Sequence, residues 1–219
     1  MRKLIRYPLR IIDNLDPPII QFSPIRSGST LIYNMVRLLL PNKRIYKRHK
    51  LEEIPSKSKK YVITYRNPID CLASSMKRFN LEVNDKNIKY HLDQIKVNGL
   101  DDLISVFEMD EYLKLKYEQF YSNFDYAFDA LEEYFELRFE AELREKIYIE
   151  YSTDKVISKT SSMKDFSEYD KKNFFHGNHV SSSKGKPNSY QEYFNINQLN
   201  YIEKDLREYS RILGYKVWL

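Results

Sequence analysis

The chain has 219 residues, of which 42% are hydrophobic and 31% charged, and its formal net charge is +5 at pH 7. This balance is typical of a globular protein, and the positive charge favours anionic partners without separating nucleotides from nucleic acids or acidic polysaccharides. The single cysteine, Cys71, excludes an intrachain disulfide and fits a reducing compartment.

Two further features bear on location and organisation. No apolar run reaches the roughly 18 residues that a membrane-spanning helix needs. The N-terminal segment is basic, but Arg6, Pro8 and Arg10 interrupt the apolar stretch that a signal peptide requires. We therefore expect a cytoplasmic protein without a membrane partner. Because no repeat or low-complexity linker divides the chain, we also expect one domain over residues 1–219.

Strands and helices alternate along most of the chain. Short apolar or β-branched runs predict strands at residues 17–23, 44–49, 59–66 and 111–118. Apolar residues at helical spacing predict helices at residues 30–40, 67–79, 123–137 and 196–215. The stretch 151–189 is rich in serine, lysine and asparagine, and predicts a long functional loop with a short helix in it. This order predicts an α/β fold with a mainly parallel sheet, in which ligands bind beyond the carboxyl ends of the strands.

The segment SPIRSGST, residues 23–30, joins the first predicted strand to the first predicted helix and has the composition of an anion-binding loop. Gly28 permits close approach of the backbone, and Arg26 supplies a planar cation. Hydroxyl groups come from Ser27, Ser29 and Thr30. The segment is not a Walker A loop, because no lysine follows Gly28 and no second glycine precedes it. The alternative is an ordinary capped turn.

Two other segments predict a second phosphate site. Arg66 ends the strongest predicted strand, and Ser74 follows two turns into the next helix. Near the C-terminus, a flexible basic stretch contains Lys184, Gly185 and Lys186. Two separated phosphate sites without an evident metal site predict a nucleotide that is phosphorylated at both ends. The alternatives are that Arg66 pairs with Asp70 on the next helical turn and that the lysines are solvent-exposed. The segment HGNH has two histidines but no evident third ligand, so we expect no metal there.

These segments resemble, in order, the motifs of the sulfotransferases that use 3′-phosphoadenosine 5′-phosphosulfate (PAPS). PIRSGST is similar to their 5′-phosphosulfate loop, and RNPIDCLAS to their 3′-phosphate motif. KYEQF is similar to a strand-borne Tyr-Glu segment, and SKGKPNSYQEYF to a late segment that contains Lys-Gly. The resemblance extends from residue 18 to about residue 195.

The resemblance implies a P-loop-like three-layer α/β fold and transfer of a sulfonate group from PAPS to a hydroxyl or amine. The acceptor would be a small molecule or a glycan, the product 3′-phosphoadenosine 5′-phosphate (PAP), and no metal or nucleic acid would be needed. Binding of the 5′-phosphate and the sulfonate is implied for Arg26, Ser27, Gly28, Ser29 and Thr30. Binding of the 3′-phosphate is implied for Arg66, Ser74, Lys184, Gly185 and Lys186. Tyr117 is implied to approach the adenine.

The resemblance also implies catalytic roles. The stretch YKRHK is similar to the K-[TS]-H segment of the family, which lies between the two phosphate motifs. It implies that His49 is the general base and that Lys47, together with Arg26, stabilises the developing charge. An imidazole with an ordinary pKa near 6.5 is suited to accept the acceptor's proton.

The chain departs from the family pattern at three positions. Leu31 stands where an aromatic residue often stacks on adenine, Ser183 replaces an arginine, and Asn188 replaces a glycine. Two other functions remain open: a P-loop-type nucleotide phosphotransferase, or a non-catalytic protein that binds a nucleotide or polyanion. The acceptor is not readable from the sequence, and we expect its pocket to come from loops at residues 76–110 and 151–182.

Overall fold

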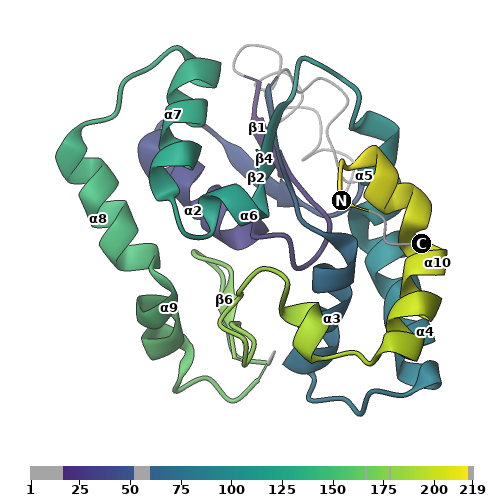
Figure 1. The fold of residues 1–219 in the computed structure, drawn as a ribbon. Helices are drawn as coiled ribbons and strands as arrows, with labels where there is room; N and C mark the ends of the chain where they lie inside the picture. Colours follow the sequence, from purple (N-terminus) through teal and green to yellow (C-terminus); the bar gives the residue numbers. More distant parts are fainter. Residues whose placement is uncertain (1–16, 52–59, 166, 178, 217–219) are drawn as a thin grey trace, which may run out of the picture.

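A four-stranded parallel sheet forms the centre of the protein (Figure 1). The structure is a computed structural model that describes residues 17–51, 60–165, 167–177 and 179–216. The strands are β1 (Ile19–Phe22), β2 (Ile45–Arg48), β3 (Lys60–Tyr65) and β4 (Leu113–Lys116), in the order β2-β1-β3-β4. Each lies within a predicted strand, and all three pairings are parallel, so the predicted parallel sheet is confirmed.

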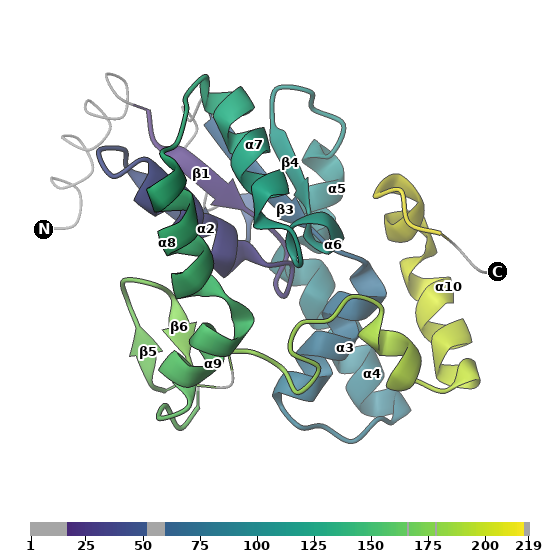
Figure 2. The same ribbon diagram turned by 60° about the vertical axis from the view of Figure 1, so that its left-hand side comes forward.

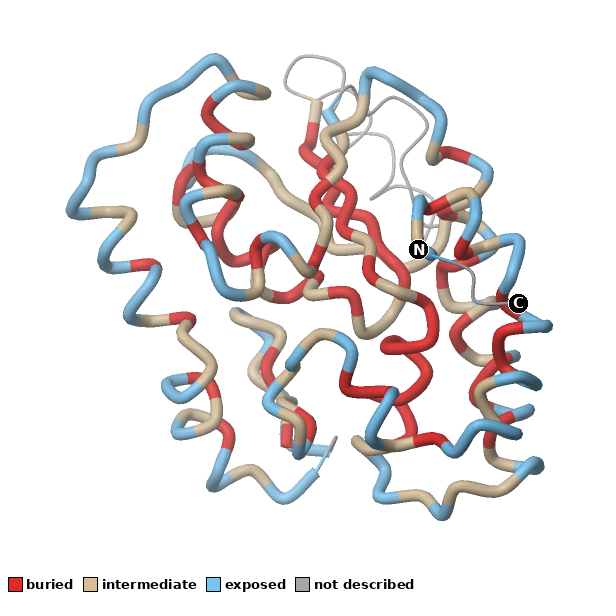
Figure 3. Tube along the Cα trace, in the orientation of Figure 1, coloured by how far each residue is buried: buried red, intermediate tan, exposed pale blue. Residues whose placement is uncertain are grey.

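Two layers of helices cover the sheet because successive side chains of a strand point to opposite faces. Ile19 and Val62 pack with α2 (Ser29–Leu39), α7 (Phe124–Phe135) and α8 (Ala141–Tyr151). Ile20 and Ile63 pack on the other face, in a core built from the following elements: α3 (Pro68–Arg78), α4 (Asp85–Ile95), the π-helical turn η2 (Lys96–Leu100), α5 (Asp101–Val106) and α10 (Ile196–Ile212). Figure 3 shows that burial is most continuous in β1, in the middle of β3 and along α3.

The helices at predicted positions begin and end as their sequences suggest. The Asn67 side chain accepts a hydrogen bond from the N–H of Ile69 and caps α3 ahead of Pro68, which fits the first turn of a helix. α10 begins with a capping box formed by Asn195 and Gln198. It ends just before Gly214, whose φ of 70° lies in the left-handed region that favours glycine.

Two predictions about local structure were wrong, and one helix was not predicted. The strand predicted at residues 111–118 ends at Lys116, and Tyr117 begins a short helix, α6 (Tyr117–Phe120). The stretch 76–110, expected as a pocket loop, is largely helical, because Ile88, Leu92 and Ile95 form an apolar face that packs into the core. α8 was not predicted, because its apolar residues do not gather on one side of the helix.

The stretch 151–189 contains more regular structure than a long loop. It includes α9 (Thr153–Thr160) and a small antiparallel pair, β5 (Tyr169–Asp170) with β6 (Phe175–His176), and the turn η3 (Ser189–Glu192) begins at its end. Figures 1 and 2 show α9 and this hairpin beyond the sheet, across from α3. The carboxyl ends of the four strands therefore open toward a space bounded by both. None of the described helices is long and apolar enough to cross a membrane.

Candidate functional site

A cavity of about 460 Å³ lies at the carboxyl ends of the strands. Of the residues predicted for the site, its walls include Arg26, Gly28, Ser29, Thr30, Lys47, His49, Arg66, Ser74, Tyr117, Lys184 and Gly185. Ser27 and Lys186 do not line it. The fold therefore brings together five segments that are separated in the sequence. Residues 151–182 contribute to the cavity wall as expected. Of the stretch 76–110, only Arg78 lines the cavity.

The loop between β1 and α2 is held in a fixed, tight shape. Gly28 has a φ of 80°, and a Cβ atom there would lie 2.7 Å from ring atoms of both Tyr117 and Phe120, so only glycine fits. Ser27 is fully buried and its hydroxyl donates to the Pro24 carbonyl at 2.7 Å. Ser27 therefore fixes the loop from behind, while Ser29 and Thr30 open α2 on the cavity side.

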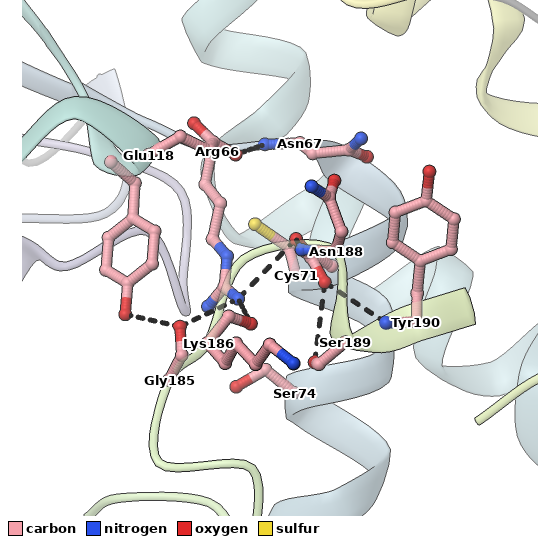
Figure 4. A network of polar contacts seen from close by, with 12 residues as sticks. Arg66, Asn67, Cys71, Ser74, Glu118, Gly185, Lys186, Asn188, Ser189 and Tyr190 are labelled. Carbon is pink, nitrogen blue, oxygen red and sulfur yellow. Dashed lines mark hydrogen bonds and ion pairs between the residues drawn. The ribbon is translucent and has the colours of Figure 1, made fainter. Parts of the chain in front are cut away.

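Arg66 lies at one end of the cavity, which we call the Arg66 end, with 3% of its surface exposed. Its NH2 atom donates to the carbonyls of Gly185 at 3.2 Å and Lys186 at 3.1 Å. The guanidinium also lies 4.2 Å from the centre of the Tyr117 ring. The alternative pairing with Asp70 is present too, at 3.6 Å. Figure 4 shows the Arg66 side chain reaching toward the backbone of Gly185 and Lys186.

Asp70 ties the loop at residues 184–190, which we call the late loop, to α3. It is fully buried and accepts hydrogen bonds from the N–H of Asn188 at 2.6 Å and of Tyr190 at 3.3 Å. Figure 4 shows the late loop held against the start of α3. Tyr117 completes the connection, because its hydroxyl donates to the Gly185 carbonyl at 2.8 Å. A Cβ atom on Gly185 would lie 2.5 Å from that hydroxyl. Tyr117 is thus fixed between two glycine turns.

The opposite part of the cavity, which we call the Lys47 end, concentrates positive charge. Lys47 Nζ donates to Thr30 Oγ1 at 3.0 Å and lies 5.3 Å from the centre of the Phe174 ring. Burial, followed by repulsion from Arg78 and Arg26, lowers the pKa of Lys47 to about 8. The cavity here therefore favours any group that brings negative charge.

Arg26 connects the two ends. Its Nε donates to Ser74 Oγ at 3.0 Å, and its NH1 donates to the His179 carbonyl at 3.4 Å. Burial and the neighbouring Arg66 lower the pKa of Arg26 to about 10. The hydroxyl of Ser74, predicted to share a phosphate with Arg66, is thus hydrogen-bonded to Arg26.

His49 has a defined tautomer. Its Nδ1 lies 2.8 Å from the carbonyl oxygen of Ser23. Because a carbonyl only accepts hydrogen bonds, Nδ1 carries the hydrogen and Nε2 carries the lone pair. In the neutral imidazole, this tautomer leaves Nε2 to accept a proton, as a general base requires.

Sequence reasoning missed Arg78, His176 and His179, all of which line the cavity. Arg78 NH2 donates to the ring of His176, and His179 Nδ1 lies 3.3 Å from His176 Nε2. The histidines were considered only as metal ligands, and the described residues contain no group of three side chains able to hold a metal ion. The available signal was spacing, because Arg78 follows Ser74 by one helical turn and so shares its face.

The late lysines lie at the rim. Lys184 Nζ pairs with Asp154 at 3.1 Å, and both side chains are largely exposed. Lys186 reaches toward Glu192 at 3.8 Å, outside the cavity, and contributes its backbone carbonyl to Arg66. Of this predicted group, Lys184 and Gly185 therefore face the cavity.

Comparisons with known proteins give a structural match only. No family model and no curated protein sequence matches the chain. The structure of mouse sulfotransferase SULT7A1 complexed with PAP has a TM-score of 0.64 at 15% identity, over 95% of this chain and 93% of that one. Retinol dehydratase with androsterone and PAP has a TM-score of 0.67 at 13% identity, over 89% and 80% of the two chains. Its complex with retinol and PAP gives 0.66 at 13%, over 89% and 81%.

The chain has the sulfotransferase fold. The likeness covers most of each compared chain, and the predicted parallel α/β architecture is confirmed by it. At 13–15% identity it is a likeness of fold. The roles of individual residues therefore depend on the geometry of the cavity itself.

The cavity has aromatic side chains near Leu31, the residue that stands where an adenine-stacking aromatic residue was expected from the family resemblance. Leu31 lines the cavity, and so do Tyr121 and Phe124 from the segment that follows β4. Tyr121 lies 5.6 Å from Tyr117 between ring centres, at an angle of 36°. The aromatic side chains beside Leu31 thus come from the segment after β4. The family resemblance had implied only Tyr117 of this segment as a neighbour of adenine.

Proposed function

We propose that this protein is a sulfotransferase that transfers a sulfonate group from PAPS to a hydroxyl or amine of an acceptor. The observation that carries the proposal is a single cavity with cations at two separated positions. Two tight glycine turns, at Gly28 and Gly185, border the cavity, which occurs on a fold whose similar structures hold PAP. A nucleotide that is phosphorylated at both ends matches this spacing of charge.

The Arg66 end fits a 3′-phosphate. Arg66 Nε is buried and has no hydrogen-bond partner among the described residues, so a donor is available on a guanidinium that is already held in place. A guanidinium is always charged and suits phosphate oxygens. Lys184 at the rim adds a cation whose bond to Asp154 is exposed and easily exchanged.

The Lys47 end fits the 5′-phosphate and the sulfonate. The first N–H groups of α2 have no partner within the helix and are an anion site of the kind found at helix N-termini. Arg26 and Lys47 flank this position. PAPS supplies the sulfonate when bound, and PAP is the leaving group. The residues of the chain would hold and neutralise both.

The reaction needs one bond to form and one to break. The acceptor oxygen or nitrogen bonds to sulfur while the bond between sulfur and the phosphate oxygen breaks, which leaves negative charge on that oxygen. Lys47 and Arg26 would stabilise this charge, and loss of one such donor typically costs about 3 kcal/mol in the transition state. The acceptor's proton would pass to His49 Nε2.

His49 suits this role better than the other two histidines of the cavity. Burial and the charge of Arg78 lower the pKa of His176 to about 4. Burial and His176, with Arg26 and other cations, hold the pKa of His179 well below its usual value. A proton on either ring would add charge to a cluster of cations. The ring of His176 is also already contacted by Arg78 and His179, whereas the Nδ1–H of His49 is held by the Ser23 carbonyl.

The test is thermal unfolding with PAP alone and with ATP plus Mg²⁺. PAP at about one hundred times its Kd stabilises the folded state by roughly 2.7 kcal/mol, and the metal is not needed. Stabilisation by ATP and Mg²⁺ only would instead identify a phosphotransferase. Stabilisation by neither, with salt-sensitive binding of polyanions, would identify a non-catalytic binder.

His49→Ala tests the base. We expect PAP to stabilise this variant as it does the wild type, while sulfonate transfer from PAPS falls at least a hundredfold, since general-base catalysis contributes that much. Lys89→Gln, at an exposed position of α4 outside the cavity, is the control and should keep transfer within a few-fold. Unchanged turnover in His49→Ala would show that another group takes the proton.

A further inference from the structure

One group of residues in the cavity is not used by the proposed transfer. Arg78 ends α3, and His176 and His179 come from β6 and the segment that follows it, nearly 100 positions later in the sequence. All three line the same cavity. The fold therefore brings a guanidinium and two imidazoles to one place.

Arg78 belongs to the Lys47 end. After burial, repulsion from Arg78 is the largest cause that lowers the pKa of Lys47. Burial and repulsion from Arg26 lower the pKa of Arg78 in turn. Arg78 thus lies beside the groups assigned to the sulfonate.

Arg78 is also a cation of the cavity that the proposed contacts with PAPS do not use. Arg66 and Lys184 are assigned to one end of the donor, and Arg26 and Lys47 to the other. None of the described residues that line the cavity is an aspartate or a glutamate. In a partly buried site, cations held close together favour a bound anion strongly. With both phosphate ends accounted for, the remaining charge belongs to the acceptor.

The guanidinium of Arg78 is oriented by the histidines. Arg78 NH2 lies 2.8 Å from His176 Nδ1 and also contacts Nε2, so the guanidinium is held against the ring of His176. His176 is itself held by the carbonyl oxygen of Gly177, 2.9 Å from Nδ1, and by His179 Nδ1, 3.3 Å from Nε2. A guanidinium has five N–H donors in a planar fork, and a fork held in one direction suits a carboxylate, sulfate or phosphate.

We propose that the acceptor is itself an anion: a hydroxylated molecule whose carboxylate, sulfate or phosphate group is bound by Arg78 beside the position of transfer. This inference rests on the proposed function. The rest of the acceptor would contact Tyr151, Tyr169 and Phe174, whose rings line the cavity on the same side as His176 and Lys47.

The first experiment uses protein saturated with PAP, so that the donor site is filled. Inorganic phosphate and inorganic sulfate are each titrated into wild type and Arg78→Gln by calorimetry. We expect a saturable site in the wild type and at least tenfold weaker binding in Arg78→Gln, because hydrogen bonds to charged groups carry differences of this size. Lys89→Gln removes an exposed lysine on α4 and is the control for net charge. Arg78→Lys keeps the charge without the fork and should recover part of the affinity.

The second experiment asks whether the anion belongs to the acceptor. Sulfonate transfer from PAPS is measured with 4-hydroxybenzoate and with its neutral counterpart 4-hydroxybenzamide. We expect kcat/KM to favour the acid by at least tenfold in wild type and in Lys89→Gln, and by less than threefold in Arg78→Gln.

The outcomes separate the two proposals. A wild-type protein that does not bind PAP refutes the sulfotransferase function. A wild-type protein that binds PAP but shows no second anion site overturns only the inference about the acceptor. A second site that is unchanged in Arg78→Gln overturns it as well. If Arg78→Gln misfolds and does not bind PAP, Arg78→Lys is used in its place. A reduced preference for the acid over the amide in Arg78→Lys then supports recognition by the guanidinium, and an unaltered preference overturns it.

Discussion

The two ends of the cavity hold their cations in opposite ways. At the Arg66 end, the guanidinium has two backbone carbonyls, the ring of Tyr117 and the carboxylate of Asp70 as neighbours. At the Lys47 end, cations face other cations, and the pKa of Lys47 is lowered to about 8 by burial and by Arg78 and Arg26. The protein itself holds the first end in place before any ligand binds, whereas the second end depends on a ligand for its opposite charge.

This difference separates residues that hold the fold from residues that serve the reaction. Where the protein supplies the opposite charge, a substitution exposes an uncompensated buried charge and destabilises the fold. Where a ligand supplies it, a substitution changes binding and turnover and leaves the fold largely intact. Stability and ligand affinity, measured on variants of each end, therefore test the comparison.

The largest effect on stability is expected at Asp70. Asp70→Ala removes the acceptor of two backbone N–H groups and the carboxylate beside Arg66, so the free energy of unfolding should fall by about 3–5 kcal/mol in urea denaturation. Asp93→Ala, at an exposed position on α4, is the control and should change it by less than about 0.5 kcal/mol. A loss below about 1 kcal/mol in Asp70→Ala would show that the Arg66 end does not depend on its internal partners.

The sequence predicted the parts of the site that are local. The loop at residues 23–30, the strand that ends before Arg66 and the cap at Asn67 follow from short-range patterns: a glycine in a turn, β-branched runs, and an asparagine before a proline. These are decided by a few neighbouring residues, and the structure has them where they were predicted.

The parts that depend on distant contacts were not predictable. In the sequence, Asp70 looks like any acidic residue in the first turn of a helix. Only the fold places the N–H groups of Asn188 and Tyr190 against its carboxylate. The pairing of Arg78 with His176 likewise spans two remote segments. The alternating pattern of residues 111–118 predicted Tyr117 within a strand. In the structure Tyr117 begins α6 and packs between Gly28 and Gly185.

The Lys47 end should respond to pH. In the free protein Lys47 loses its proton near pH 8, and a bound phosphate favours the charged form, so PAP binding takes up a proton as the pH rises above 8. The affinity for PAP should therefore fall by about tenfold between pH 7 and pH 9 in calorimetry. Lys47→Met should bind PAP more weakly at pH 7 and lose most of this pH dependence. An equally steep profile in Lys47→Met would assign the titration to another group.

The smallest effect is expected at Lys184, where the two ends share the solvent-exposed rim. Its pair with Asp154 is largely exposed, and such pairs contribute about 0–1 kcal/mol, so Lys184→Gln should leave the melting temperature nearly unchanged. PAP affinity should fall a few-fold at low salt and by less at high salt, because exposed charges are screened. Asp154→Asn is the decisive partner variant. If the pair competes with the ligand, removing Asp154 releases Lys184 and strengthens PAP binding by about twofold on the same electrostatic grounds. If Asp154→Asn weakens PAP binding as much as Lys184→Gln does, the pair positions the late loop, and the rim then belongs with the Arg66 end, whose geometry the protein sets for itself.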